Sequence, residues 1–259
     1  MNKNLASILG AAYDSNFFSL GIKHGAELEE KGILVFPDFI NTKGLDKIQD
    51  EATAVKPKSY QSASEYNVYV LPTDPEYPIE SPRNRIMKTT KKCIPNDLIP
   101  VDSPLMQLYN ASSIQEWFCK IMRVPNLYPY ADPLSSVNIN YYEKGDALGW
   151  HFDNSDFTIT LLAKNCKKGG VYEYLTEMRH TDDGKENYPL VEKILNEEIP
   201  PKRQTAQTGD LMIFKGNKSL HRVTEVLEGE RILVTFNYNL EAGIPLSEQS
   251  RKTFFGRIA

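Results

Sequence analysis

The second half of the chain is a series of short apolar or alternating stretches separated by turn signals. Apolar and polar residues alternate over Val137–Tyr142, as expected for a strand with one buried face. Turn signals, such as Gly169-Gly170 and Gly209-Asp210, interrupt the series. Several short strands without intervening helices are typical of a β-sandwich or β-barrel rather than a β-α-β sheet. The strands predicted in this way are Val137–Tyr142, Phe157–Leu162, Val171–Leu175, Leu211–Phe214 and Ile232–Asn239.

The first half combines one short strand with helices and loops. Ile33–Phe36 has the pattern of a buried strand that stops at Pro37. A helix should follow, because Leu45, Ile48 and Ala52 fall on one helical face. Together the two halves predict a mainly β protein with flanking helices, of the α+β class. The remaining segments are predicted to be helical at 1–30 and 103–123 and loop-rich with short strands at 54–100.

Composition and charge narrow the class of protein without identifying it. The 259 residues are 41% hydrophobic and 25% charged, as in an ordinary globular protein. The net charge of −4 gives no overall electrostatic footprint for nucleic acid, so no nucleic-acid partner is expected. Cys93, Cys119 and Cys166 are odd in number and widely spaced, which favours free thiols. No apolar stretch is long enough to span a membrane, and we expect a cytoplasmic protein without a membrane partner.

Three side chains have the types and spacing of a metal site. His151 and Asp153 are two residues apart, so on or beside a strand they point to the same side. His221, on a distant strand, could complete one triangular face of an octahedron. Two histidines and one carboxylate with three open positions are typical of a non-haem Fe(II) oxygenase. Arg231 lies in the next predicted strand, where it could pair with the distal carboxylate of 2-oxoglutarate.

Each of these signals is weak by itself. A His-x-Asp sequence occurs by chance in many chains, and a lone histidine is more often a structural residue. The two other histidines, His24 and His180, lie in polar, unpatterned stretches and are given no role. It is the combination of His151, Asp153, His221 and Arg231 that favours the metal site. A zinc hydrolase uses the same ligand types, and a binding module with a decayed site is a further alternative.

The sequence around the first histidine resembles a known superfamily. The stretch Asn140-Tyr-Tyr-Glu-Lys-Gly…His151-Phe-Asp153 resembles the Asn-x-Tyr-x-x-Gly…His-x-Asp pattern of Fe(II)/2-oxoglutarate-dependent dioxygenases. The resemblance implies one domain over residues 1–259, with a double-stranded β-helix (jelly-roll) core at 126–259 and mostly helical support and substrate loops at 1–125. It also implies Fe(II), 2-oxoglutarate and O₂ as cofactor and cosubstrates. The implied iron ligands are His151, Asp153 and His221, and the implied 2-oxoglutarate ligands are Asn140, Tyr142 and Arg231.

A narrower resemblance concerns the substrate. The segments Trp150–Phe157, Gly169–Glu173, Leu220–Val223 and Lys252–Arg257 resemble those of radical halogenases and hydroxylases that act on free amino acids, lysine above all. The halogenases of that family have Gly or Ala in place of the carboxylate ligand, which leaves a position for chloride. Because this chain keeps Asp153, the resemblance implies hydroxylation. The implied reaction removes a hydrogen atom from an unactivated C–H bond and returns a hydroxyl group.

Residues that could bind an amino acid are predicted from their charge and position. Arg83 is the candidate for the substrate carboxylate, although a solvated basic loop would also explain it. Candidates for the ammonium groups are Asp132, Asn154 and Asp156, and Trp150 is a candidate wall of the pocket. Asn237 and Asn239 follow Arg231 at even spacing and could face the barrel interior. For each of these residues a structural role is an equal alternative, and Glu173 is expected to be a loop charge.

Several questions stay open at the level of sequence. The expected partner is a small-molecule amino acid, with a protein side chain or another small molecule as the alternative substrate. Residues 177–204 form a polar excursion that is either a lid or an insertion. The sequence determines neither the carbon attacked, the stereochemistry, nor the oligomeric state, for which a homodimer is one option.

Overall fold

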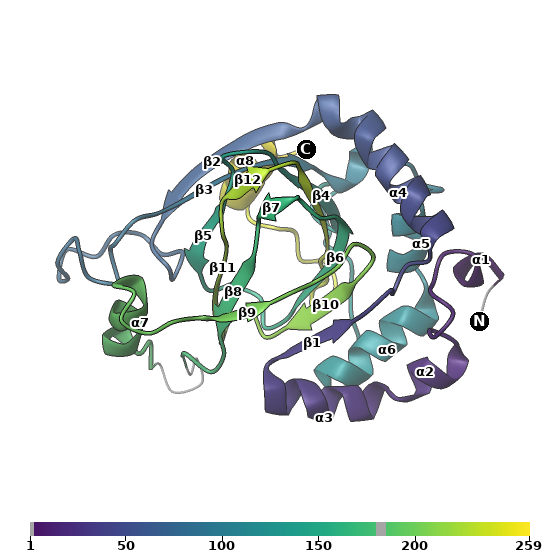
Figure 1. Ribbon diagram of the computed structural model, residues 1–259, viewed down its shortest axis with the longest axis horizontal. Helices are drawn as coiled ribbons and strands as arrows, with labels where there is room; N and C mark the ends of the chain where they lie inside the picture. Colours follow the sequence, from purple (N-terminus) through teal and green to yellow (C-terminus); the bar gives the residue numbers. More distant parts are fainter. Residues whose placement is uncertain (1–2, 180–184) are drawn as a thin grey trace.

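Two antiparallel sheets face each other and enclose a common interior (Figure 1). The computed structural model describes residues 3–179 and 185–259. The larger sheet consists, in spatial order, of β1 (Ile33–Phe36), β10 (Leu211–Phe214), β6 (Thr158–Lys164), β13 (Arg231–Phe236), β4 (Val137–Tyr142), β3 (Met87–Ile94) and β2 (Tyr60–Tyr66). The smaller sheet consists of β5 (Leu148–His151), β11 (Leu220–Val223), β8 (Tyr172–Leu175) and β9 (Lys202–Gln204). A short pair, β7 (Lys168–Gly169) and β12 (Val226–Glu228), lies at one end of the barrel (Figure 1).

This arrangement confirms the predicted fold class and jelly-roll core. Every strand pair for which a register is given is antiparallel. Neighbours in the sheets are often far apart in sequence, as where β13 lies between β4 and β6. β1, β2 and β3 all precede residue 125, so the larger sheet draws on both parts of the chain.

Helices cover the outer face of the larger sheet (Figure 1). Ile139 on β4, Leu161 on β6 and Val234 on β13 project into this layer because they occupy alternate positions of their strands. Trp117 is fully buried at its centre, and its indole nitrogen donates a hydrogen bond to Nδ1 of His24. The N-terminal helices, which include two short 3₁₀ turns, are α1 (Lys3–Ala6), α2 (Ser15–Ser19), α3 (Gly21–Lys31), α4 (Thr42–Val55), η1 (Lys56–Lys58), η2 (Asn96–Leu98), α5 (Pro104–Tyr109) and α6 (Ser112–Met122).

The opposite face of the larger sheet lines the interior, and it is polar along β4. On β4 the inward residues are Asn138, Asn140 and Tyr142. The prediction that this strand is only half-buried was wrong, because all six of its residues are buried. Its polar side chains face an enclosed interior rather than solvent, which is the arrangement expected of a strand that lines a binding site.

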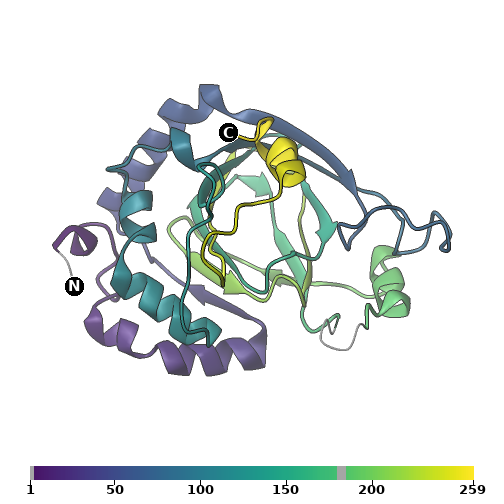
Figure 2. The same cartoon turned by 180° about the vertical axis from the view of Figure 1, so that it is seen from behind.

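Two later helices pack at the sides of the barrel. α7 (Tyr188–Leu195) lies against the outer face of the smaller sheet, where Val191 and Ile194 join a cluster with Trp150 and Phe152. α8 (Glu248–Phe255) lies at the opposite end of the barrel from β7 and β12, in front of the strands in Figure 2. Among the described residues, no helix has both the length and the apolar character needed to cross a membrane.

Candidate metal centre

His151 and His221 are a cross-strand pair on the smaller sheet. They lie directly opposite each other on β5 and β11, and their ring centroids are 4.2 Å apart. The register then shifts, so that Val223 faces Leu148. A bulge of this kind changes which side chains of a strand point inward. It lets Leu148 and His151, three residues apart, both face the interior.

Backbone carbonyl groups hold both imidazoles in the orientation that metal binding requires. Nδ1 of His151 lies 2.8 Å from the carbonyl oxygen of Gly149, and Nδ1 of His221 lies 2.8 Å from that of Ser219. In the neutral form of each ring, Nδ1 must therefore carry the proton, which leaves the lone pair on Nε2 for a metal. Burial, and then the neighbouring His151, lower the pKa of His221 to about 4, so that this ring is neutral at pH 7.

Asp153 follows β5 and brings a carboxylate to the same point. Its oxygens lie 3.3 Å from Nε2 of His151 and 3.6 Å from Nε2 of His221. Its backbone N–H donates to the carbonyl oxygen of Gly216, 3.1 Å away, and the Thr158 hydroxyl donates to Oδ2. Burial alone would raise the pKa of Asp153, but the two histidines and Thr158 hold it well below its usual value. The carboxylate is therefore ionised at neutral pH.

The three groups form a site that fits Fe(II). One ligand atom from each of His151, Asp153 and His221 lies within 4.8 Å of the others. Two neutral imidazoles and one carboxylate that converge from one side are the ligand set of non-haem Fe(II) oxygenases. The predicted iron ligands are thus brought together by the fold.

Arg231 is buried in the interior and forms no ion pair among the described residues. It is opposite Tyr142 in the sheet, and its guanidinium carbon is 5.8 Å from the centre of that ring. The side chain is 4% exposed, and Nε and Nη1 have no hydrogen-bond partner among the described residues. Gly170, with φ +60°, lets the chain pass close by, since a Cβ there would lie 3.2 Å from Cδ of Arg231. A buried arginine with unpaired N–H groups fits a bound carboxylate, as 2-oxoglutarate would supply.

Asn140 lies on the same interior wall as this arginine. It faces Leu233 across β4 and β13, one inward position away from the Tyr142–Arg231 pair. Its Oδ1 accepts a hydrogen bond of 2.8 Å from Nζ of Lys91, while its Nδ2 makes a 3.4 Å contact with the Leu233 carbonyl oxygen. Asn140, Tyr142 and Arg231 therefore share one wall of the interior, and their roles toward 2-oxoglutarate stay predictions.

Four residues of the site were not found from the sequence: Lys91, Tyr172, Arg179 and Gly216. Tyr172 is inward on β8, its ring is 5.7 Å from that of His221, and its buried hydroxyl has no partner among the described residues. Arg179 donates to two carbonyl oxygens of the metal loops, those of Asn217 at 2.5 Å and Asp153 at 3.3 Å. Only Tyr172 had a local sequence signal, the Gly-Gly-x-Tyr order. Lys91, Arg179 and Gly216 are brought to the site by contacts with distant segments.

Trp150 and Glu173 belong to the outer face of the smaller sheet. Trp150 precedes His151 and points the other way, with the Arg222 guanidinium carbon 4.7 Å from the centre of its ring. It therefore packs outside the barrel rather than in the wall of the pocket. The prediction that Glu173 is a loop charge was wrong: it lies on β8, is 2% exposed, and binds Arg203 and Arg222 at 3.0 and 2.7 Å.

Arg83 and Asp132 are engaged away from the triad. Arg83 donates to the carbonyl oxygen of Pro72 at 2.7 Å and lies 3.9 Å from the Asp74 carboxylate. Asp132 accepts hydrogen bonds from the backbone N–H groups of Leu134 and Leu246, at 2.9 and 2.8 Å, so it ties the C-terminal segment to the loop before β4. Neither residue has a contact with the metal ligands among the described interactions.

The other predicted substrate residues lie around the metal end of the barrel. Asn154 and Asp156 are exposed, and Asp156 accepts a 2.5 Å hydrogen bond from Asn217, which precedes His221. Asn237 donates to Oδ1 of the inward Asn138 at 3.1 Å. Asn239 pairs with the segment at Tyr128 and donates to the Ile244 carbonyl oxygen at 2.8 Å. Their roles in substrate binding stay predictions.

Comparisons with known structures show the same fold. An oxidoreductase of the 2OG-Fe(II) oxygenase family from Burkholderia pseudomallei superposes with a TM-score of 0.55 at 14% identity, covering 86% of this chain and 92% of that one. HygX from Streptomyces hygroscopicus, with nickel, 2-oxoglutarate and hygromycin B bound, has a TM-score of 0.54 at 11% identity, with 87% and 89% covered. A prolyl-4-hydroxylase from Pseudomonas putida has a TM-score of 0.53 at 11% identity, with 85% and 100% covered. No curated protein sequence matches the chain.

The protein is an Fe(II)- and 2-oxoglutarate-dependent oxygenase. Three features define this class: the jelly-roll fold, the His-Asp-His triad and the buried arginine with unpaired N–H groups. Residues 23–254, which are most of the chain, match the family model described as Halogenase D. The chain belongs to the Halogenase D family.

Proposed function

We propose that this protein hydroxylates a free amino acid, with lysine as the first substrate to test. The observation that carries the proposal is the carboxylate of Asp153 between His151 and His221. In the amino acid halogenases that the sequence resembles, Gly or Ala stands at this position and leaves space for chloride. Here the position holds an ionised carboxylate, which favours transfer of a hydroxyl group over transfer of a halogen.

Different residues of the site would bind the metal and the cosubstrate. His151 and His221 would bind iron through Nε2, since their Nδ1 atoms face carbonyl oxygens. Asp153 would supply the third ligand, and the hydrogen bond from Thr158 would hold it in place. Arg231 would bind the distal carboxylate of 2-oxoglutarate with its unpaired N–H groups, next to Tyr142 and Asn140.

When bound, Fe(II), 2-oxoglutarate and O₂ together supply an oxidant able to convert an unactivated C–H bond to C–OH, with succinate and CO₂ as the other products. The protein's part is to hold one substrate carbon close to the metal, because a misplacement of about 1 Å can lower the rate on the order of 10²-fold. Asn154 and Asp156, exposed beside the metal loop, remain candidates for contacts with the ammonium groups of an amino acid.

The test is a substrate screen under controlled oxygen. Protein loaded anaerobically with Fe(II) and 2-oxoglutarate is mixed with single free amino acids in chloride buffer, and air is then admitted. We expect succinate release coupled to a mass gain of one oxygen atom on lysine or a related amino acid. Turnover of a peptide or another small molecule, with none of any free amino acid, would replace this proposal with its alternative.

A variant of the carboxylate ligand separates hydroxylation from halogenation. Asp153→Gly should abolish hydroxylation, and chlorination of the same carbon is the activity it could gain. Thr158→Val is the matched control, because it removes a hydrogen bond to the carboxylate but keeps the ligand. Hydroxylation that survives Asp153→Gly unchanged would show that Asp153 is not an iron ligand.

A further inference from the structure

We propose that Lys91 binds a carboxylate group inside the barrel, beside Asn140. The inference rests on the function proposed above, because it concerns the anions that this reaction brings into the site. A cation for the substrate carboxylate was predicted at Arg83, but the contacts of Arg83 lie with Pro72 and Asp74 in its own loop. Lys91 is a cation that the fold directs into the same interior as the metal ligands.

Strand alternation places Lys91 on the inner face of β3. Thr89, two residues earlier, accepts a 2.9 Å hydrogen bond from the backbone N–H of Gly149 on β5, and the Tyr66 hydroxyl lies 2.5 Å from its Oγ1. The Tyr66 ring in turn lies 6.1 Å from the ring of His151. Lys91 follows Thr89 on this face, and its Nζ reaches Oδ1 of Asn140.

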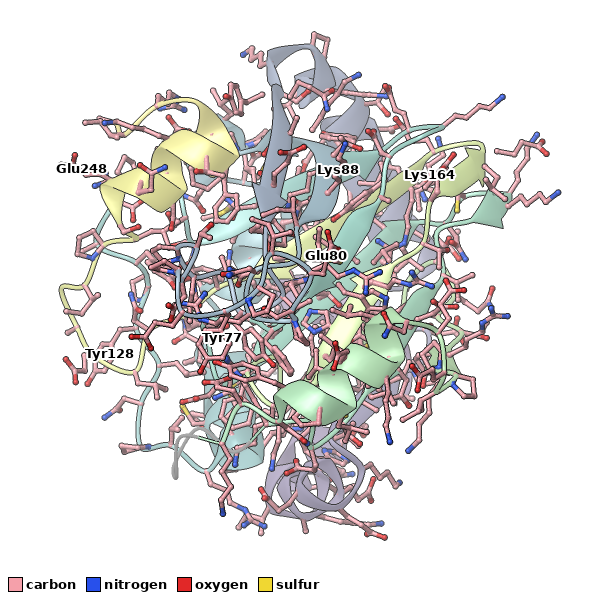
Figure 3. The ribbon with its side chains drawn as sticks, turned by 90° about the vertical axis from the view of Figure 1, so that its left-hand side faces the viewer. Tyr77, Glu80, Lys88, Tyr128, Lys164 and Glu248 are labelled. Atoms are coloured by element: carbon pink, nitrogen blue, oxygen red, sulfur yellow. The ribbon has the colours of Figure 1, made fainter. Side chains whose placement is uncertain are left out.

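The neighbouring lysines of β3 point outward and have counter-charges. Nζ of Lys92 lies 2.6 Å from the Glu143 carboxylate, and Nζ of exposed Lys88, labelled in Figure 3, lies 3.7 Å from that of Glu65. In the described part of the chain, no carboxylate pairs with Lys91. Apart from the neutral Asn140 amide, the ammonium lies 5.7 Å from the ring centre of Phe254 on α8. Lys91 and Arg231 are thus both inward cations that form no ion pair within residues 3–179 and 185–259.

The contact with Lys91 also fixes the direction of the Asn140 amide. An ammonium group can only donate hydrogen bonds, so Asn140 must present its oxygen to Lys91. The amide nitrogen is left with only the 3.4 Å contact to Leu233. Lys91 and Asn140 therefore offer N–H donors from neighbouring positions, and a carboxylate has two oxygens to accept them.

Two ligands bring carboxylates into this site, 2-oxoglutarate and the amino acid, and charge balance favours the amino acid as the partner of Lys91. The charges of Fe(II) are matched by Asp153 and one carboxylate of 2-oxoglutarate, and Arg231 matches the other. Lys91 then remains as an excess cation, which the carboxylate of an amino acid substrate would neutralise. The alternative source is 2-oxoglutarate itself, through a contact shared with Asn140.

Binding measurements that need no turnover distinguish these sources. Protein loaded with Ni(II) is titrated calorimetrically with 2-oxoglutarate, and the saturated complex is then titrated with lysine, lysine amide and other free amino acids. The variants are Lys91→Met, Lys91→Arg and, as a matched control, Lys88→Met on the outer face of the same strand. Urea unfolding of each variant shows whether it is folded. Lys91→Arg keeps the positive charge and serves as the test variant if Lys91→Met does not fold.

If the substrate is the source, Lys91→Met should weaken amino acid binding by about 10- to 100-fold and leave 2-oxoglutarate affinity unchanged. Lysine amide should then bind the unaltered protein as weakly as lysine binds Lys91→Met. A similar loss of 2-oxoglutarate affinity instead would identify the cosubstrate as the source. Equal affinity of Lys91→Met and Lys88→Met for both ligands would overturn the proposal. If no free amino acid binds the unaltered protein, the proposed function fails, and the 2-oxoglutarate titration alone decides the role of Lys91.

Discussion

A Cβ atom at Gly216 would lie 2.1 Å from Oδ2 of Asp153 and 2.7 Å from its Cβ. The backbone of Gly216 also accepts the hydrogen bond from the Asp153 N–H, so the two loops touch at the carboxylate ligand. Gly216→Ala should therefore turn the carboxylate away from the two histidines. Rotation can move the carboxylate but not the Asp153 Cβ, so the backbone must shift as well. We therefore expect a loss of metal affinity of about 10- to 100-fold together with a lower urea midpoint.

Calorimetric titration with Ni(II), together with urea unfolding of the metal-free protein, tests this expectation. Gly243→Ala is the control, because it has open space but a φ of +77° that strains any other residue. It should lower the urea midpoint and leave metal affinity unchanged. Normal metal affinity in Gly216→Ala would show that the close approach has no part in holding the ligand.

Arg231 should contribute to ligand binding and not to the stability of the ligand-free protein. Burial lowers the pKa of its guanidinium, as expected for a cation without a counter-charge. Arg231→Met should weaken 2-oxoglutarate binding by about 2–3 kcal/mol, or about 30- to 150-fold, while the ligand-free protein becomes no less stable. Titration with 2-oxoglutarate and urea unfolding measure the two effects. Arg203→Met is the control, because Arg203 pairs with Glu173 on the outer face.

A similar but smaller effect on 2-oxoglutarate affinity is expected at Tyr172, whose hydroxyl has no hydrogen-bond partner among the described residues. Its ring packs against Phe214 and His221, and Phe would preserve that packing. Tyr172→Phe should leave the ligand-free protein equally or more stable, because it removes a buried donor without a partner. If the hydroxyl donates to bound 2-oxoglutarate, affinity should fall by about 2- to 12-fold. Tyr174→Phe, on the same face of β8, is the control, and equal 2-oxoglutarate affinities in the two variants would exclude this contact.

The sequence predicted the parts of the site whose signals are local. His151 and Asp153 are two residues apart, and the strands before His221 and around Arg231 have clear apolar patterns. The β-sandwich or barrel class was predictable for the same reason, since apolar alternation records which face of a strand is buried. The jelly-roll core was implied by the resemblance to the dioxygenases.

Residues whose environment depends on distant segments were not predictable. β3 has the sequence Met-Lys-Thr-Thr-Lys-Lys-Cys-Ile and lacks apolar alternation, because its inner face lines a polar interior. Its register against β4, which brings Lys91 to Asn140, is a tertiary property. Trp150 was predicted as a wall of the pocket, but it is adjacent to His151 on β5, and strand alternation turns adjacent side chains to opposite faces.

Arg179 should position the metal ligands without touching the metal. It donates to the carbonyl oxygens of Asp153 and Asn217, which belong to the loops on either side of the triad. Its guanidinium also lies 4.6 Å from the centre of the Phe152 ring. Arg179→Met should lower metal affinity by about 10-fold, within the range for groups that orient metal ligands. Lysine at this position should recover only part of the loss, because a point charge cannot span both carbonyls.

The measurement for Arg179 is again Ni(II) titration, with Lys215→Met as the control. Lys215 is also a buried cation near the start of the metal loop, but it pairs with Glu29 on α3. That variant should lose stability with little change in metal affinity. If Arg179→Met binds Ni(II) as tightly as the unaltered protein, the loops keep their positions without it.

The pH dependence of stability should reflect an ion-pair cluster around Lys56. Lys56 binds both Glu143 and Glu230, and Glu143 also binds Lys92. Hydrogen bonds from Lys56 and Lys92 lower the pKa of Glu143 from its usual 4.5. Burial alone would raise the pKa of Glu230, but its bonds with Lys56 and Lys164 lower it. Both carboxylates thus bind protons more readily in the unfolded chain, so their contribution is complete above pH 4.5 and is lost as the pH falls through the folded-state values.

Urea midpoints between about pH 6 and pH 3 should therefore decrease on acidification in the unaltered protein. The double variant Glu143→Gln/Glu230→Gln should show a shallower decrease and, because these pairs are partly exposed, a loss of only about 1 kcal/mol at pH 7. Glu65→Gln is the control, since Glu65 forms an exposed pair with Lys88 and should leave the slope unchanged. If the urea midpoint of the double variant decreases with pH as steeply as that of the unaltered protein, the acid sensitivity arises from other carboxylates. Asp153 is one candidate, because its pKa is held well below the usual value.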